Sequence, residues 1–285
     1  MSLVGVLTDS CASIPEALIE KYNIKVVPYY IHRGMETLRD LVDVQREEFF
    51  RWLPTAVKLP TTASPGPGDY LQAFREMAQR TREIVSVHMT SLGSGAYQAA
   101  MAAREMAREL LPDLRIEVID SRNVSLCQGW MVIEAARAAL EGVSFEGVID
   151  CVRQLIPKTH MIQTADTLRY LYMGGRIGRA KHLVGSLLNI KPLIGMEDGV
   201  IVPLGTARSR PRAYQRIAEM MEEAVGHLGQ VKVAFVHAAA SQEIEKLRHI
   251  VEERLNCVET LVAELSPALG VHTGPGTVGV CYYPV

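Results

Sequence analysis

Residues 85–98 read VSVHMTSLGSGAYQ, and this stretch decides the fold. Its first residues, with Ile84 before them, form the β-branched apolar run that is typical of an interior strand. A loop of Thr, Ser and Gly follows, and from Ala96 the chain continues AYQAAMAAREMAREL, which is rich in strong helix formers. A helix that begins after such a loop offers unpaired N–H groups and a dipole that favours negative charge. The stretch therefore predicts a strand, an anion-binding loop around Ser94 and a helix.

The same alternation of strand and helix extends on both sides of this stretch. Further strands are predicted at residues 4–7, 24–31 and 115–119, and helices at residues 15–22, 43–53, 69–80, 124–141 and 144–155. A possible cap for the second of these helices is Asp43. This alternation favours an α/β fold with a parallel sheet between two layers of helices.

Polar residues follow several of these strands. The carboxyl ends of parallel strands meet at one edge of a sheet, where ligands bind. We therefore expect three segments to converge there: Thr8-Asp9-Ser10, the Ser94 loop with Gly93 and Gly95, and Asp120-Ser121. A hydroxyl-rich loop at residues 60–68, which contains Thr61 and Thr62, precedes a helix and is expected to join them.

The second half of the chain has a different rhythm. Two short apolar runs flank Glu197-Asp198-Gly199, which is a hairpin signal. A short helix is predicted at 167–173, longer helices at 211–226 and 241–255, and strands at 231–237, 258–264 and 277–283. This order predicts a second α/β domain with a mixed sheet. We place the domains at residues 1–157 and 158–285.

Composition narrows the class of protein. The formal net charge of −2 offers no broad basic surface for nucleic acid. The five cysteines are odd in number and show no CxxC spacing, so a reducing compartment is expected. The N-terminus does not resemble a signal peptide, and no apolar run reaches the ~20 residues of a membrane-spanning helix. The expectation is a cytoplasmic protein without stable membrane insertion.

The loop at Gly93 invites several interpretations. A Walker A loop is excluded because no lysine lies between Lys58 and Lys158. A dinucleotide fingerprint places Gly or Ala where this chain has Gln98, although Asp120 would suit a ribose hydroxyl, so this alternative stays open. The spacing of a nucleophile elbow is missing. The loop alone is equally compatible with a plain tight turn.

Metal ligation has little support in the sequence. The eight histidines are scattered and show no ligand spacing. His272 differs from the others because it lies in a Gly/Pro segment, GVHTGPG, that we expect to be a loop close to a partner. The simpler alternative is a turn histidine that is hydrogen-bonded within its own loop.

Taken together, these residues resemble the DegV family of bacterial fatty-acid-binding proteins. The matching segments occur in the family's order along nearly the whole chain: TDS at 8–10, PTTASP at 60–65, SLGSGAYQ at 91–98, IDS at 119–121, LYMGGRI at 171–177, KP at 191–192, GTAR at 205–208 and HTGPG at 272–276. Each segment is weak alone, and the set is specific.

The resemblance implies a two-domain protein that binds one long-chain fatty acid between its domains. It assigns the carboxylate to the hydroxyls of Thr62 and Ser94, with Gly95 beside them, and to a network completed by His272, with Thr273 and Gly274 adjacent. Supporting roles are implied for other residues of the matching segments: Asp9, Ser10, Thr61, Gly93, Asp120, Ser121 and Arg176.

The resemblance also implies a partner. A separate fatty acid kinase would phosphorylate the bound acid for phospholipid synthesis, and Arg208 matches a family arginine associated with the acyl phosphate. The chain itself would be a carrier and not an enzyme, with no cofactor besides its lipid. The family loop usually reads Thr-Ser-Gln-Pro, but Ala63 stands here after Thr62 and removes one hydroxyl; Gly93 and Ala96 also depart from the family pattern.

The physics of the ligand agrees with this assignment. Burying about fourteen methylenes contributes roughly 11 kcal/mol before ordering costs, and a buried carboxylate must accept hydrogen bonds. Residues 183–190 (LVGSLLNI) are the candidate chain-contacting helix. The alternative is a phosphoryl- or acyl-transfer enzyme that uses the Ser94 loop with Asp9 and Asp120.

Overall fold

A computed structural model describes residues 4–184, 190–227 and 229–285 of the chain. The chain forms two compact units, which are Met1–Asp43 with Thr62–Pro157 and Val44–Thr61 with Lys158–Val285. Residues 44–61 thus belong to the second unit although they lie in the first half of the sequence. The predicted domain boundary after residue 157 instead places residues 44–61 in the first domain.

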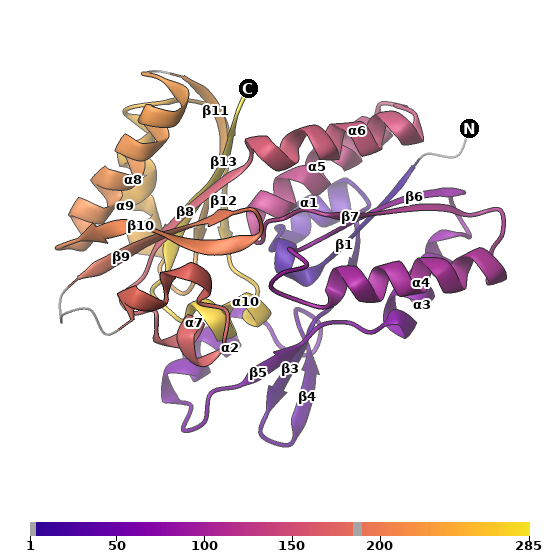
Figure 1. The fold of residues 1–285 in the computed structure, drawn as a ribbon, viewed down its shortest axis with the longest axis horizontal. Helices are drawn as coiled ribbons and strands as arrows, with labels where there is room; N and C mark the ends of the chain where they lie inside the picture. The colour runs from indigo at the N-terminus through magenta and orange to yellow at the C-terminus, as the bar shows by residue number, and fades with distance from the viewer. Residues whose placement is uncertain (1–3, 185–189, 228) are drawn as a thin grey trace. The chain divides into compact units, whose positions relative to one another are not determined.

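The first unit is built on a parallel sheet with the strand order β2-β1-β6-β7. Its strands are β1 (Gly5–Asp9), β2 (Lys25–Val27), β6 (Glu83–His88) and β7 (Arg115–Asp120). Its helices are α1 (Glu16–Lys21), α3 (Pro67–Met77), α4 (Ala96–Leu110), α5 (Leu126–Leu140) and α6 (Phe145–Leu155). Figure 1 shows α3 and α4 on one face of this sheet and α1, α5 and α6 on the other. The predicted three-layer arrangement is confirmed.

Burial explains why the central stretch folds as predicted. Ile84, Val85 and Val87 of β6 are completely buried, as expected of a strand covered on both faces. Helix α4 buries alanines on its inner face, Ala100, Ala103 and Ala107, at the spacing of one helical stripe. These small side chains let the helix lie close to the sheet.

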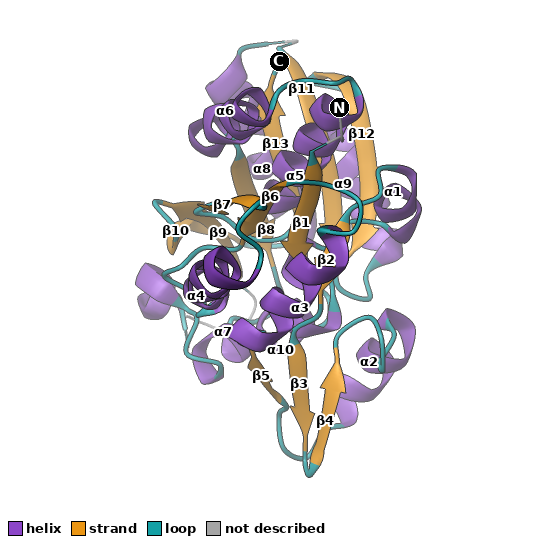
Figure 2. Cartoon of the chain, turned by 90° about the vertical axis from the view of Figure 1, so that its right-hand side faces the viewer, coloured by secondary structure: helices purple, strands orange, loops and turns teal. Residues whose placement is uncertain are grey.

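The predicted strand at 24–31 is wrong, because the chain changes sheets in its middle. Strand β2 ends at Val27, and β3 (Tyr30–Arg33) pairs instead with β4 (Glu36–Arg39) and β5 (Thr61–Ala63) in a separate three-stranded sheet (Figure 2). Pro28 stands between the two strands and has no N–H to donate to a ladder. The hydroxyl-rich loop predicted at 60–68 therefore contains a strand.

Helix α2 (Arg46–Trp52) begins later than predicted. Its proposed cap, Asp43, accepts hydrogen bonds from the backbone N–H and the guanidinium of Arg39 at 2.8 and 2.9 Å. Gln45 is the cap residue instead, and its side chain makes no capping hydrogen bond.

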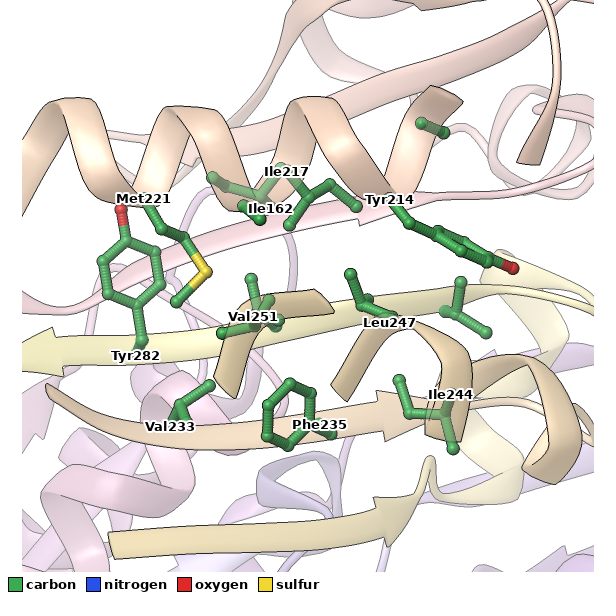
Figure 3. Packing of buried hydrophobic residues seen from close by; sticks show 14 of the residues in the cluster. Ile162, Tyr214, Ile217, Met221, Val233, Phe235, Ile244, Leu247, Val251 and Tyr282 are labelled. Carbon is green, nitrogen blue, oxygen red and sulfur yellow. The ribbon is translucent and has the colours of Figure 1, made fainter. Parts of the chain in front are cut away.

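The second unit holds the predicted mixed sheet, whose strand order is β10-β9-β8-β13-β11-β12; β8 was not among the predicted strands. Its strands are β8 (His160–Thr164), β9 (Lys191–Glu197), β10 (Val200–Ala207), β11 (Gln230–His237), β12 (Asn256–Glu264) and β13 (Val278–Pro284). Strands β11 and β12 run parallel, whereas the other neighbours are antiparallel. Helices α8 (Arg210–Val225) and α9 (Ser241–Glu252) bury Ile217 and Leu247 against Phe235 of the sheet (Figure 3).

The predicted hairpin between β9 and β10 is confirmed. Asp198 and Gly199 at its turn have φ angles of 47° and 81°. Two successive left-handed residues define the turn that matches the twist of a hairpin.

His272 lies in a helix and not in the predicted loop. Helix α10 (Pro267–Thr273) begins at Ser266, whose Oγ accepts a hydrogen bond from the N–H of Leu269 at 3.4 Å. Pro267 at the first helical position favours this start. Helix α10 packs on α7 (Arg169–Met173) and α2.

Two further expectations concern apolar segments. The proposed chain-contacting helix at 183–190 lies mostly outside the described residues. Within the ranges that the structure describes, no helix combines the length and the apolar character needed to cross a bilayer.

We expect Gly129→Ala to destabilise the first unit by about 1–3 kcal/mol, because an added methyl overpacks the core. A Cβ at Gly129 in α5 would lie 2.9 Å from the carbonyl oxygen of Ala12. Gly68→Ala, where a Cβ meets nothing within 4 Å, is the matched control and should be neutral or slightly stabilising. Urea unfolding monitored by the buried Trp130 of the same unit measures both; equal stability of the two variants would contradict the prediction.

Candidate functional site

The loops at the carboxyl edge of the parallel sheet hold one another in place. Backbone N–H groups of Thr90 and Ser121 donate to the carbonyl oxygens of Asn123 and His88 at 2.8 and 2.9 Å. The N–H of Ser91 lies 3.3 Å from both carboxylate oxygens of Asp120. The loops after β6 and β7 therefore form one connected structure.

Asp9 connects the end of β1 to the same structure. Its carboxylate is fully buried and accepts hydrogen bonds from the N–H groups of Cys11 and Met89 at 3.1 and 3.2 Å. Nδ1 of His88 lies 3.2 Å from Oδ2 of Asp9. The predicted convergence of the three polar segments is confirmed by these bonds.

The neighbouring polar residues are also engaged by the backbone. The Oγ of Ser10 accepts a hydrogen bond from the N–H of Tyr29 at 3.0 Å. The Oγ of Ser121 donates to the carbonyl oxygen of Asn123 and accepts from its N–H. Asp9, Ser10, Asp120 and Ser121 thus fix loops. The transferase alternative needs Asp9 and Asp120 for a ligand, and the dinucleotide alternative needs Asp120, so this geometry argues against both.

Ser94 stands at the start of α4. Its Oγ accepts a hydrogen bond from the N–H of Ala96 at 3.3 Å and lies 2.6 Å from the hydroxyl of Tyr29. Gly95 is the cap residue of the helix, and a Cβ there would lie 3.4 Å from Oγ of Ser64. The site therefore combines a helix N-terminus with clustered hydroxyls, which is an arrangement that binds anions.

Two further predicted hydroxyls, those of Thr61 and Thr62, lie on β5. Thr62 is half-buried, whereas Thr61 is exposed. A Cβ at Gly93 would meet the methyl group of Thr90 at 3.2 Å, so the glycine keeps the loop tight.

In the second unit, His272 is half-buried at the end of α10. A Cβ at Gly174 would lie 2.3 Å from Nδ1 of His272, so only glycine leaves room for the ring. Gly274 has a φ of 76°, and a Cβ there would lie 2.2 Å from the ring of Tyr170. The two glycines thus let α7 and α10 approach closely around the imidazole.

Burial lowers the pKa of His272 to about 4, and the charge of Arg176 acts in the same direction. The guanidinium of Arg176 is exposed and donates a hydrogen bond to the carbonyl oxygen of Gly174 at 2.7 Å. At neutral pH the imidazole is therefore uncharged and offers one donor and one acceptor.

The remaining predicted residues have distinct surroundings. The Oγ1 of Thr273 donates to the carbonyl oxygen of Leu269 at 3.2 Å, inside its own helix. Arg208 is exposed in the bend between β10 and α8. Its neighbour Arg210 instead pairs with Asp166 at 2.6 Å.

Sequence reasoning missed two tyrosines. Tyr29 contacts Ser94, and Tyr170 packs against Gly274. The pair Tyr29-Tyr30 after a proline is the available signal for the first, although its composition also favours a strand. In the ranges that the structure describes, no group of three or more His, Cys, Asp or Glu side chains is placed to hold a metal ion.

This fold and this loop structure define an α/β protein with hydroxyls clustered at a helix N-terminus. The chain belongs to the DegV family: the family model described as "Uncharacterised protein, DegV family" matches residues 3–285. A DegV domain-containing protein of Caldanaerobacter subterraneus is 32% identical over 99% of both chains, and Protein DegV of Bacillus subtilis is 28% identical over 98% of both.

Solved structures agree with the family. A DegV family protein from Thermus thermophilus, described as fatty acid binding, superposes with a TM-score of 0.92 at 29% identity and covers 99% of this chain and 100% of its own. DegV of Bacillus subtilis, described as a fatty acid binding protein, superposes with a TM-score of 0.88 at 27% identity over 100% of both chains. A stearic acid-binding protein from Eubacterium ventriosum has a TM-score of 0.86 at 25% identity, with 99% and 98% coverage.

We expect the imidazole of His272 to titrate near pH 4, far below the ~6.5 of an unfolded chain. As the pH falls, His272 is therefore protonated in the unfolded state before it is protonated in the folded state. The contribution of His272 to stability is complete above pH 6.5, and about 3 kcal/mol of it is lost as the pH falls to 4.

NMR titration of the ring protons, with His272→Gln to assign the signal, measures this pKa directly. Arg176→Gln should raise the pKa of His272 modestly, because the charge of Arg176 is removed and burial of the ring remains. A wild-type midpoint near 6.5 would contradict the burial of the ring.

Proposed function

We propose that this protein binds one long-chain fatty acid and presents its carboxylate to a separate fatty acid kinase, without catalysis of its own. The observation that carries this proposal is the Ser94 hydroxyl at the N-terminus of α4, in a chain whose solved relatives are described as fatty acid binding. A cytoplasmic location, and no cofactor besides the lipid, belong to the same proposal.

The chemistry of the site suits a carboxylate. Ser94 and Thr62 bear hydroxyls, and the first N–H groups of α4 have no carbonyl partner in their own helix. These donors would stabilise a buried anion by hydrogen bonding, so the site needs no permanent cation. The apolar tail supplies most of the favourable free energy, because each buried methylene contributes about 0.8 kcal/mol.

A neutral His272 fits the same chemistry. An imidazole with a pKa of about 4 donates a hydrogen bond to a carboxylate without carrying a charge at neutral pH. Thr273 and Gly274 follow it at the end of α10 and complete the proposed set in this unit.

The transfer of the phosphoryl group is assigned to the partner kinase. Asp9 and Asp120 are engaged by backbone N–H groups, which supports a carrier over a transferase. The exposed guanidinium of Arg208 is available to a dianionic acyl phosphate or to the kinase.

We expect Ser94→Ala, Thr62→Ala and His272→Gln each to weaken binding of oleate or palmitate by about 10- to 100-fold, which is the effect of one hydrogen bond to a charged group. Calorimetry on lipid-free protein measures this. Ser91→Ala in the same loop is the matched control and should bind normally. Unchanged affinity in all three variants would contradict the head-group assignment, and no uptake by the wild type would contradict the function.

A double-mutant cycle with Ser94→Ala and His272→Gln tests whether both residues act on one carboxylate. If they do, the second substitution costs less in the double variant than alone, because the first has already disturbed the ligand. Strict additivity would place the two residues on separate ligand groups.

We expect Arg208→Ala to bind fatty acid normally and to slow acyl-phosphate formation with the kinase at least tenfold, because a guanidinium that contacts phosphate is lost. Arg212→Ala, in the same basic run, is the control. A phosphorylation assay with purified kinase measures the rate, and a normal rate for Arg208→Ala would refute the role.

A further inference from the structure

The hydroxyl of Tyr29 contacts the hydroxyl of Ser94. The side chain of Tyr29 is 4% exposed, and its position is set by Pro28 and by the hydrogen bond from its N–H to Oγ of Ser10 at 3.0 Å. Its hydroxyl lies 2.6 Å from Oγ of Ser94, which makes this the short contact of the loop. The carboxylate-binding residues proposed above do not include Tyr29.

The hydroxyl of Ser94 has one proton and two lone pairs. One lone pair accepts the N–H of Ala96 at 3.3 Å. A phenol, with an ordinary pKa near 10, is a much stronger proton donor than an alcohol, so Tyr29 is the donor in the short contact. Both lone pairs of Ser94 are then occupied, and its proton points away from Tyr29 and Ala96.

The short contact lies in buried surroundings. Cys11, which is 2% exposed, is a neighbour of Tyr29. Burial raises the pKa of both the Cys11 thiol and the Tyr29 phenol, so both stay protonated. The proton of Tyr29 therefore points to Ser94, and the proton of Ser94 points away from both Tyr29 and Ala96.

We propose that Tyr29 is a positioning residue that commits the Ser94 hydroxyl to donate its proton to a ligand carboxylate. This inference rests on the proposed function and adds the reason why this serine is preorganised. A free serine hydroxyl rotates among three staggered positions, whereas Ser94 is held with its donor aimed outward before the ligand arrives.

The test compares Tyr29→Phe with Tyr30→Phe. Tyr30 is the adjacent tyrosine, and its hydroxyl donates to Asp69 at 2.9 Å, away from Ser94. Each variant is titrated with palmitate and with methyl palmitate, which has the same tail and no charge. We expect Tyr29→Phe to bind palmitate about tenfold more weakly and methyl palmitate unchanged, and Tyr30→Phe to bind both normally.

A second measurement separates positioning from packing. In a Ser94→Ala background, Tyr29→Phe should cause no further loss of palmitate affinity, because it acts only through Ser94. Ser10→Ala, which removes the acceptor of the Tyr29 N–H and leaves the phenol in place, should cause a smaller loss in the same direction, and it keeps the proposal testable if Tyr29→Phe folds poorly.

Three results would overturn the proposal: unchanged palmitate affinity in Tyr29→Phe, equal losses for palmitate and its methyl ester, or full additivity with Ser94→Ala. Wild-type protein that binds no palmitate would refute the proposed function, and the inference with it. Wild-type binding that is weakened by Ser94→Ala and unaffected by Tyr29→Phe would refute the positioning role alone.

Discussion

The buried carboxylate of Asp9 is the constraint on which the candidate site depends. A carboxylate without solvent is costly unless several donors satisfy it. Here the donors are two backbone N–H groups, one after β1 and one after β6, with the ring of His88 beside them. Satisfying this one group therefore fixes the ends of two neighbouring strands. The loop that begins after β6 starts from a determined position, and so does Ser94 further along it.

The polar residues at this edge divide into two sets with different tasks. Asp120 and Ser121 accept backbone N–H groups, as Asp9 does, and hold the loops together. Ser94 lies farther along the loop, where the backbone gives way to a helix N-terminus. A carboxylate in the second set would repel an anionic ligand, whereas a hydroxyl donates to it. The acidic side chains are thus used where they face N–H groups, and the hydroxyl is used where an anion is expected.

The sequence predicted the elements that are specified by residues close to one another in the chain. It did not predict the features that depend on contacts with distant segments. Ile84 and the alanine-rich helix after it carry their own periodicity, and Asp198-Gly199 specifies its own turn. Residues 24–31 look like one strand because strand formers stand on both sides of Pro28; only the partner strands determine that β2 and β3 belong to different sheets. Glycines around His272 suggested a loop, yet Ser266 and Pro267 start a short helix, and Gly274 after it allows a close approach to Tyr170 of α7. Tyr29 could not be predicted as a neighbour of Ser94, since that contact spans 65 residues.

Neutral donors would offer one advantage to the proposed fatty acid carrier, which has to release what it binds. A fixed buried cation would have to be desolvated, and it would remain unpaired whenever the site is empty. The second unit avoids this cost with an imidazole that stays uncharged and with an arginine that remains in solvent. Arg176 still acts on the imidazole, because its charge, after burial, disfavours protonation of His272. Burial and this positive charge together keep the imidazole neutral, and in the proposed function hydroxyls and N–H groups recognise the anion.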